Sequence, residues 1–490
     1  MKVTDVVVIG SGPSATAAIG MLIRRGICPQ VLDAGNLDDK FLGTELRGLN
    51  AMSTEVLALG NSASASVASK SWFGSSRTYD QPAESPIEYS AKVGARATYQ
   101  LGGFSRIWGG TFDLSECDKI FPVSVRPSDK HREYVRQLVP NSLTSLIDTA
   151  SREEVRGHPR FTRVFRAIER NCRQSKVEVS RARLAIDSRS GPSSCTGCHG
   201  CFVGCPVDAI WFSGTQIHEW ARSGRINYQP RSVVTTLHEN DGYVTIRGNR
   251  CDSPFEVKAQ RVILAAGALS SSAILVNSSI YRQLRLQDTS ASYGAALSPS
   301  RWQSTNVVQH GLSQIWIRFP ESHVAQLYAP DSVHLPKLRQ RLSSLRKLTN
   351  PVSQVLIERL IPIILIREAS HSDSIELSKQ GDHVIARAVT NAKSEIQHVH
   401  ALNTLRKSLR GTGLFLLTPF FEQPSVGTGQ HVGASIPHLS GSDELGRPLG
   451  LNRVHVVDGS VLPKIPLGSV TPLIMANATR IASYIQLTDS

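Results

Sequence analysis

The first 33 residues carry the pattern that most restricts how this chain can fold. An apolar run at 6–9 leads into Gly10-Ser-Gly12-Pro13-Ser14-Ala15, and small and apolar residues then follow at helical spacing. In such a strand–G-x-G-x-x-A–helix unit, the first glycine allows a tight turn, the second lets the backbone approach a pyrophosphate, and the alanine permits close helix–strand packing. A second apolar strand ends in Asp33, where a ribose-binding carboxylate is expected. The pattern predicts an α/β, Rossmann-like domain that binds a dinucleotide.

Length and charge narrow the class of protein. The 490 residues are enough for two or more domains, and 40% hydrophobic content favours a folded core over disorder. The net charge of +14 favours anionic neighbours such as nucleotides, acidic glycans or phospholipid. No nucleic-acid-binding module is recognisable, so we expect no nucleic-acid partner. We find no bilayer-spanning apolar run and no secretory leader before the first strand, which predicts a cytoplasmic protein.

Four of the eight cysteines form one short run: Cys195, Cys198, Cys201 and Cys205, followed by Pro206. The spacing C-x2-C-x2-C-x3-C-P is that of bacterial ferredoxins and predicts iron–sulfur ligands. In two-cluster ferredoxins the fourth cysteine binds the other cluster. A single run therefore predicts a [3Fe–4S] cluster, or a [4Fe–4S] cluster if Cys205 folds back or a distant cysteine contributes. Zinc prefers two separated pairs, but zinc, a disulfide pair and free thiols stay open as alternatives.

Three further stretches carry recognisable motifs. Residues 101–110 hold two glycine pairs around Trp108, and residues 261–270 read as a strand that ends in Ala266-Gly267. Near the C-terminus, Asp458-Gly459 follows a short strand, and a helix begins after Gly468-Ser469. The positive end of that helix dipole would stabilise an anionic reduced flavin. Residues 5–35, 101–110, 261–270 and 431–485 resemble, in family order, the glucose–methanol–choline (GMC) oxidoreductases.

This resemblance implies FAD as cofactor, a bipartite fold and oxidation of an alcohol CH–OH group. With the first motif, it implies cofactor contacts at Gly10, Gly12, Pro13, Ser14, Asp33, Gly35, Gly103, Ser105, Trp108, Gly109, Val233, Ala266, Gly267, Asp458, Gly459 and Val470.

The resemblance also implies a catalytic pair. His431 stands at the position of the family's base, where a neutral imidazole can take the alcohol proton while hydride leaves to the flavin. Ala434 replaces the usual glycine there, and His438-Leu439 replaces Met-Gly, so His438 is a rival base. The second family position, His or Asn, is Ser469, which is shorter but still donates and accepts hydrogen bonds.

We expect three regions along the chain. Residues 1–120, 205–285 and 426–490 would form the FAD-binding domain, residues 121–204 a connecting region with the cysteines, and residues 286–425 a substrate domain with an antiparallel sheet and flanking helices. A helix is expected at 213–222, and alternating patterns predict strands at 313–319, 324–328, 362–367, 373–377 and 384–388. Leucines at helical spacing in 335–348, with Lys and Arg between them, predict a basic amphipathic helix, and an apolar stretch follows at 355–366. Such a helix can lie peripherally on the inner face of a membrane, although packing on the sheet is the commoner explanation.

The functional prediction is therefore an FAD-dependent dehydrogenase of an alcohol or sugar conjugate. Its electrons would pass through an iron–sulfur cluster to an external acceptor. Two alternatives stay open. One is an FAD oxidase or quinone-linked dehydrogenase whose cysteines are structural, and the other is a flavin-binding protein that has lost catalysis, as Ser469 and the altered surroundings of His431 suggest.

Overall fold

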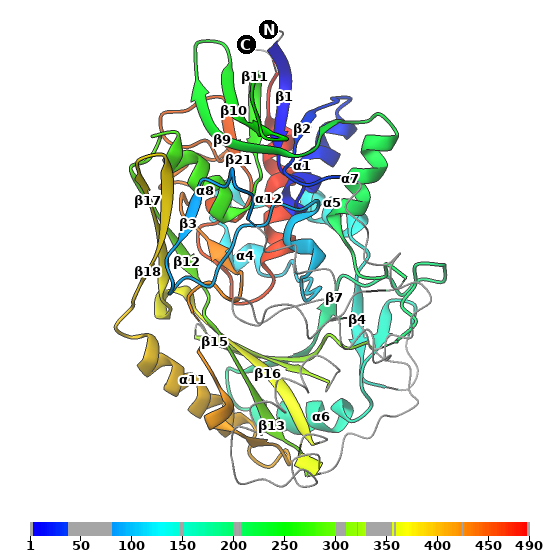
Figure 1. Cartoon of the computed structure of the whole chain (residues 1–490). Helices are drawn as coiled ribbons and strands as arrows, with labels where there is room; N and C mark the ends of the chain where they lie inside the picture. The colour runs from blue at the N-terminus through cyan, green and yellow to red at the C-terminus, as the bar shows by residue number, and fades with distance from the viewer. Residues whose placement is uncertain are drawn as a thin grey trace.

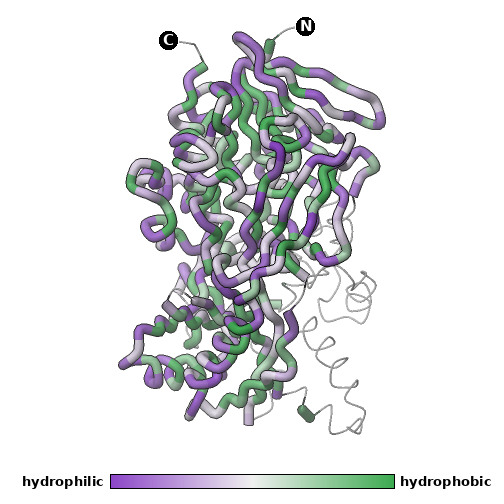
Figure 2. Tube along the Cα trace, turned by 90° about the vertical axis from the view of Figure 1, so that its left-hand side faces the viewer, coloured by the Kyte–Doolittle hydropathy of each residue, from purple (hydrophilic) through white to green (hydrophobic). Residues whose placement is uncertain are grey.

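The computed structural model consists of two stacked halves, with both termini in the upper half (Figure 1). It describes residues 3–37, 81–147, 151–198, 201, 205, 207–299, 310–320, 322–329, 355–356, 359–423 and 425–487. The upper half is built on a largely parallel sheet and the lower half on an antiparallel one. Hydrophobic segments run through the inside of both halves (Figure 2). The predicted fold class, a Rossmann-like α/β domain joined to an antiparallel sheet with flanking helices, is confirmed.

The upper sheet explains the apolar character of the first strand. Its strands are β1 (Val3–Ile9), β2 (Gln30–Leu32), β8 (Asn227–Gln229), β9 (Ser232–Glu239), β10 (Val244–Arg250), β11 (Ser253–Leu264) and β21 (Val454–Val456). The order is β8-β2-β1-β11-β10-β9, with β21 also paired to β11. β1 is parallel to both of its neighbours, and its residues 6–9 are buried on both faces. A central parallel strand is therefore a continuous apolar run.

Helices and a second sheet cover the two faces of this upper sheet. One face packs on α1 (Pro13–Arg24), α5 (Asp129–Leu138), α7 (Ser213–Arg222) and α12 (Val470–Tyr484). The other face packs on α8 (Ala268–Asn277) and on a five-stranded sheet. The predicted helix at 213–222 is thus confirmed as α7.

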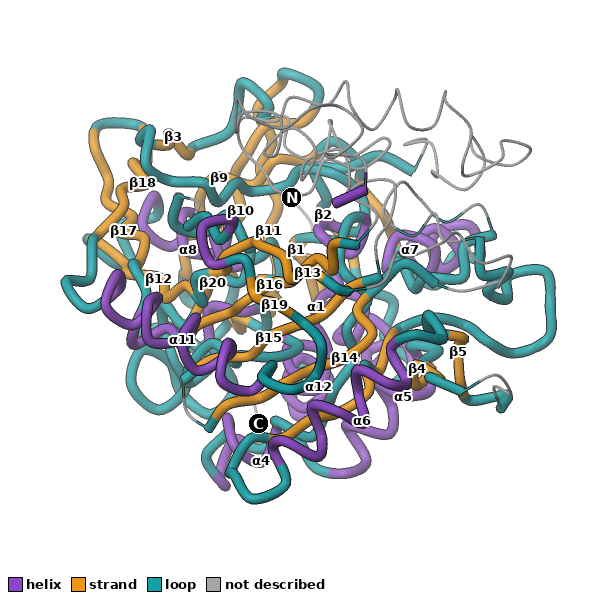
Figure 3. The backbone as a smooth tube through the Cα atoms, turned by 90° about the horizontal axis from the view of Figure 1, so that it is seen from below, coloured by secondary structure: helices purple, strands orange, loops and turns teal. Residues whose placement is uncertain are grey.

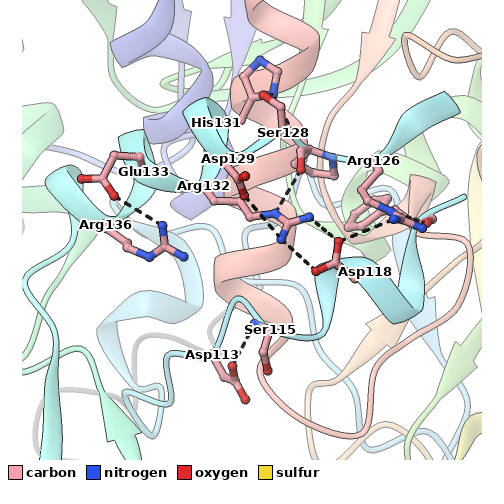
Figure 4. A network of polar contacts seen from close by, with 12 residues as sticks. Asp113, Ser115, Asp118, Arg126, Ser128, Asp129, His131, Arg132, Glu133 and Arg136 are labelled. Atoms are coloured by element: carbon pink, nitrogen blue, oxygen red, sulfur yellow. Dashed lines mark hydrogen bonds and ion pairs between the residues drawn. The ribbon is translucent and has the colours of Figure 1, made fainter. Parts of the chain in front are cut away.

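A polar network braces α5 and, through it, α12 (Figure 4). Arg132 of α5 binds Asp118 of α4 (Cys117–Ile120) through two bonds of 2.7 and 2.9 Å. His131 bonds the Ser128 amide at 3.1 Å on one side, and its other ring nitrogen lies 3.3 Å from the Ser483 hydroxyl of α12. These contacts help to fix α12, whose N-terminus reaches the main pocket.

The expected antiparallel strands divide between two sheets. The five-stranded sheet has the order β20 (Val432–Gly433), β12 (Gln283–Asp288), β17 (Ser374–Gln380), β18 (His383–Val389), β3 (Ile87–Tyr89). The six-stranded sheet has the order β19 (Phe415–Leu416), β13 (Ala291–Leu297), β16 (Leu360–Arg367), β15 (His323–Tyr328), β14 (Ser313–Phe319), β6 (Glu178–Arg181). A three-stranded sheet pairs β4 (Ser142–Ser145) with β5 (Glu154–Arg156) and β7 (Arg183–Leu184). The expectation of one substrate-domain sheet was therefore wrong, because alternation reveals a strand but not its partner.

The six-stranded sheet has a helix-covered outer face and an inner face toward the upper half. α6 (Phe161–Cys172) and α11 (Ser394–Ser408) cover the outer face (Figure 3). β16 is buried at every position, so the apolar stretch there is a core strand. The predicted amphipathic helix at 335–348 lies outside the described residues. Among the helices that are described, none is long and apolar enough to cross a bilayer. The proposed domain boundaries stay a prediction.

Candidate active site

The main pocket opens at the carboxyl end of the parallel strands. The empty space in it, together with the open solvent at its mouth, is about 1460 Å³. Its walls come from the β1–α1 turn, the end of β2, residues 96–108, the end of β11, residues 429–432 and the start of α12. The predicted contacts on these walls are Gly10, Gly12, Pro13, Ser14, Asp33, Gly103, Ser105, Trp108, Val233, Ala266, Gly267, Asp458, Gly459, Val470 and the proposed base His431.

Two glycines of the first motif differ in what surrounds them. Gly10 has φ +104°, and a Cβ there would lie 2.5 Å from the Ala265 carbonyl oxygen of the neighbouring strand end. Gly12 has an ordinary φ of −67° at the N-cap of α1, and a Cβ there would meet no atom of the described residues within 4 Å. Gly10 is therefore required by the fold, whereas Gly12 leaves space at a helix N-terminus, where an anion is favoured.

Asp33 is held at the end of β2 by two hydroxyls. Its Oδ2 accepts hydrogen bonds from Ser11 Oγ at 2.6 Å and from Tyr228 of β8 at 2.7 Å. The side chain is 6% exposed and lines the pocket. Ser11 and Tyr228 thus orient the carboxylate, and sequence analysis named neither. Ser11 could have been found inside the G-x-G motif, but Tyr228 reaches Asp33 only because β2 and β8 are paired.

The glycine-rich loop at 101–110 forms another wall through a short 3-10 turn at 103–106. Gly102 has φ +80°, and a Cβ there would overlap the Phe212 ring. The Trp108 indole N–H donates to the Trp211 carbonyl at 3.0 Å and lies edge-on to the Trp211 ring. Two of the predicted cofactor contacts, Gly35 and Gly109, are not among the residues that line the pocket. Gly35 packs against the Leu101 amide, and a Cβ at Gly109 would lie 3.9 Å from the Tyr328 hydroxyl.

The two candidate bases have different surroundings. His431 lies on the pocket wall, between Gln430 and Val432. His438 is 4% exposed; its Nδ1 lies 2.8 Å from the Asp443 carbonyl oxygen and its Nε2 lies 3.1 Å from Asn477 Nδ2. Burial lowers the pKa of His438 to about 4, so it is neutral at pH 7. The structure therefore places His431 on the pocket and His438 in the core.

The N-terminus of α12 forms the wall nearest to the second family position. Val470 and Thr471 line the pocket, while Ser469 is the N-cap residue and is 1% exposed. Ser469 Oγ has no hydrogen-bond partner within the described structure. Asp458 is buried, and its carboxyl group accepts hydrogen bonds from the Ser460 backbone amide at 3.0 Å and from the Ser271 hydroxyl. Burial raises the pKa of this carboxyl.

Three polar residues that no local motif marks, and that were not predicted, also line the pocket: Arg96, Thr98 and Gln430. Within the described structure, Thr98 Oγ1 and Gln430 Nε2 are buried and have no hydrogen-bond partner. Arg96 is held by the Val93 and Ala95 carbonyls at 2.6 and 2.8 Å. These residues add polar groups to the lining beside the open space at Gly12.

The four clustered cysteines line a second, small cavity, together with Ile186, Val207, Ala209 and Ile210. Cys205 Sγ accepts a hydrogen bond from the Ala209 amide at 3.1 Å, and Cys201 Sγ accepts one from the Gly311 amide at 3.3 Å. Burial raises the pKa of Cys195 to about 11, so this thiol is protonated at neutral pH. Among the described residues, however, no group of three or more Cys, His, Asp or Glu side chains is arranged to hold a metal ion. Four thiols on one cavity are nevertheless the donor type of an iron–sulfur site.

The two cavities are close along the chain and in space. Ile210 lines the cysteine cavity and Trp108 lines the main pocket. Trp211, the residue after Ile210, has its ring centroid 5.9 Å from that of Trp108. The pocket residues Phe104 and Ile107 also belong to the hydrophobic cluster on which Cys195, Cys201 and Cys205 pack.

Comparison with known proteins places the fold but not the family. No protein-family model matches the sequence, and no curated protein matches it. By structure, 659 solved chains match. One is pyridoxine 4-oxidase from Mesorbium loti, which aligns with a TM-score of 0.58 over 98% of this chain and 98% of that chain, at 14% sequence identity. The chain therefore has the fold of a known oxidase.

Proposed function

We propose that this chain is an FAD-dependent oxidoreductase of the GMC type that oxidises a CH–OH group. The observation that carries the proposal is the meeting of three features on one pocket: the G-x-G turn, the N-terminus of α12 and His431. The resemblance in fold to an enzyme named pyridoxine 4-oxidase supports it. The substrate class we propose is a small alcohol or sugar conjugate.

FAD bound in the pocket would supply a hydride acceptor. The pyrophosphate would lie at Gly12 and the N-terminus of α1, where backbone N–H groups and the helix dipole favour negative charge. Asp33, oriented by Ser11 and Tyr228, would accept hydrogen bonds from the adenosine ribose. The N-terminus of α12 would stabilise negative charge on the ring system.

His431 would act on the substrate as a general base. A neutral imidazole can take the hydroxyl proton as the C–H bond is broken, which is worth about 10²–10⁴-fold in rate. The second family position, Ser469, is not among the residues that line the pocket; it directly precedes the lining residue Val470. Its buried Oγ, which has no partner within the described structure, would have to turn toward the pocket to bond the same substrate oxygen. Because serine is shorter than His or Asn, we expect this clamp to be weaker than the usual family pair.

Anaerobic mixing of the purified holoprotein with a panel of alcohols and sugars tests this proposal. A reactive alcohol should bleach the flavin absorption, and His431→Ala should slow the bleach while FAD content stays normal. A His438→Ala variant provides the matched histidine control. Absence of bound FAD would refute the cofactor. FAD that no alcohol reduces would favour a flavin-binding protein without catalysis.

We further propose two competing routes for reoxidation. In the first, Cys195, Cys198, Cys201 and Cys205 hold an iron–sulfur group that supplies one-electron transfer to an external acceptor. The shared cavity and the N–H···S bonds support it. In the second, the enzyme is an oxidase or quinone-linked dehydrogenase with structural cysteines. The resemblance in fold to an enzyme named as an oxidase supports the second route.

Iron and sulfide analysis of anaerobically purified protein separates the two routes. The iron–sulfur route predicts that both iron and sulfide are present, with absorption beyond the flavin bands. Cys201→Ser should abolish that absorption, while reduction of the flavin by substrate should survive. The second predicts neither element. Rapid dioxygen consumption during turnover would then identify an oxidase, and its absence with turnover to a quinone would identify a quinone-linked enzyme.

A further inference from the structure

A buried carboxyl outside the pocket holds the loop that carries His431. Asp288, the last residue of β12, is 2% exposed, and its Oδ2 accepts the Gly427 amide at 2.8 Å. The next residue, Thr289, donates its backbone N–H to the His431 carbonyl at 3.3 Å. Two consecutive residues thus hold the loop 427–431 at its first and last positions.

Other contacts show that this loop depends on such outside bonds. Within it, Gln430 N bonds the Gly427 carbonyl at 2.9 Å, and Gln430 has φ +58°, which is unusual for a residue with a side chain. Gly427 itself has φ +78°, and a Cβ there would overlap Ala95 Cβ. The backbone is therefore in a tight conformation that the Asp288–Gly427 bond helps to maintain, directly before the proposed base.

The charges around Asp288 leave it without a direct ion pair in the described structure. The groups that act on it are Arg367 on β16, Asp373 before β17, the Ser290 hydroxyl two residues along the chain, and the Gly427 amide of the His431 loop. Arg367 donates its hydrogen bonds to other groups, namely Gln423 Oε1 at 2.8 Å and the Ser394 carbonyl. Asp373 accepts the Asn391 amide at 2.9 Å. Burial raises the pKa of Asp288 to about 7, although the Gly427 N–H and Arg367 oppose the shift.

We propose that Asp288 is a positioning residue that holds the His431 loop against the pocket and makes that hold dependent on its own ionisation. The expected effect on catalysis rests on the proposed function. The contact between Asp288 and the His431 loop does not depend on that function. An ionised carboxylate accepts a stronger hydrogen bond from an amide than a neutral carboxyl does. The loop should therefore be held more firmly above neutral pH than below it.

Hydrogen exchange of peptides covering 425–433 tests the hold directly in the FAD-bound protein. In wild type, protection corrected for intrinsic exchange should rise with pH across neutrality. Asp288→Asn keeps an oxygen acceptor but cannot ionise, so its protection should be independent of pH. Asp288→Ala should lose protection roughly tenfold at every pH. The matched control is Asp373→Asn, which removes a neighbouring carboxylate whose own bond goes to Asn391. It should keep the protection of the loop and move its pH dependence to lower pH, because the charge of Asp373 raises the pKa of Asp288.

Flavin reduction by substrate provides the second measurement. Displacement of a reacting group by about 1 Å can cost about 10²-fold in rate, so Asp288→Ala should reduce the rate roughly 10- to 100-fold with FAD content unchanged. Wild-type exchange and reduction rates in Asp288→Ala would overturn the proposal, as would an Asp288→Asn variant that keeps the wild-type pH dependence. If no alcohol reduces the wild-type flavin, the proposed function fails, but the exchange experiment still decides whether Asp288 holds the loop.

Discussion

Two glycines of one motif should give opposite results when each is replaced by alanine. Gly10→Ala places a Cβ 2.5 Å from the Ala265 carbonyl oxygen at φ +104°. A positive φ costs an L-residue about 1–2 kcal/mol, and a forced backbone shift adds about 1–3 kcal/mol. We therefore expect Gly10→Ala to destabilise the apoprotein by about 2–5 kcal/mol. The effect should exceed that of Gly26→Ala, a control at φ +76° with no atom within 4 Å of the new Cβ.

Gly12→Ala should instead leave the apoprotein almost unchanged. Its φ is ordinary and its Cβ meets no protein atom, so the change in stability should stay within about 1 kcal/mol. The same methyl group enters the space proposed for the pyrophosphate, so FAD affinity should fall at least tenfold, or about 1.4 kcal/mol.

Thermal unfolding of the three apoproteins and FAD titration of each measure both effects. Wild-type FAD affinity in Gly12→Ala would refute the placement of the pyrophosphate. A Gly10→Ala apoprotein as stable as Gly26→Ala would refute the close-approach argument.

Three further predictions concern side chains of the site and its surroundings. His431→Ala should slow flavin reduction about 10²–10⁴-fold in stopped-flow experiments, whereas His438→Ala should lower the melting temperature and change the reduction rate little. The pKa of His438 is about 4 when folded and 6.5 in its ordinary state, so the unfolded chain binds more protons between these values. Stability should fall by about 3 kcal/mol as pH falls through that window, and urea titrations of His438→Gln should show a smaller loss. Asp33→Ala should weaken FAD binding by about 1.5–3 kcal/mol, and a calorimetric titration in which Asp33→Ala binds like wild type would exclude the ribose contact.

Local patterns predicted much of the upper half. The β1–α1 turn depends on residues within one short segment, so Gly10, Gly12 and Asp33 could be assigned from spacing alone. The helix at 213–222 and the strand at 313–319 were also predicted at the bounds observed for α7 and β14. The predicted contacts on the C-terminal stretch came instead from a family resemblance, and most of them line the same pocket.

Two similar histidines show where sequence reasoning stopped. His431 and His438 lie seven residues apart in one loop-rich stretch, and both were candidate bases. Tertiary structure separates them, because Asn477 of α12 and the Asp443 carbonyl surround His438 in the core. The cysteine run shows the same limit, since its spacing matches a ferredoxin but does not specify how far apart the thiols lie in space.

The sequence by itself predicted the β1–α1 unit with its glycine turn and the acid that follows β2, because turn geometry and helix N-termini are encoded by neighbours along the chain. Only the tertiary structure decided which strands share a sheet, that Tyr228 bonds Asp33, and that Asp288 bonds the loop of His431. The last two contacts join residues 195 and 139 positions apart. They form only when separate segments are buried together and their polar groups must find partners.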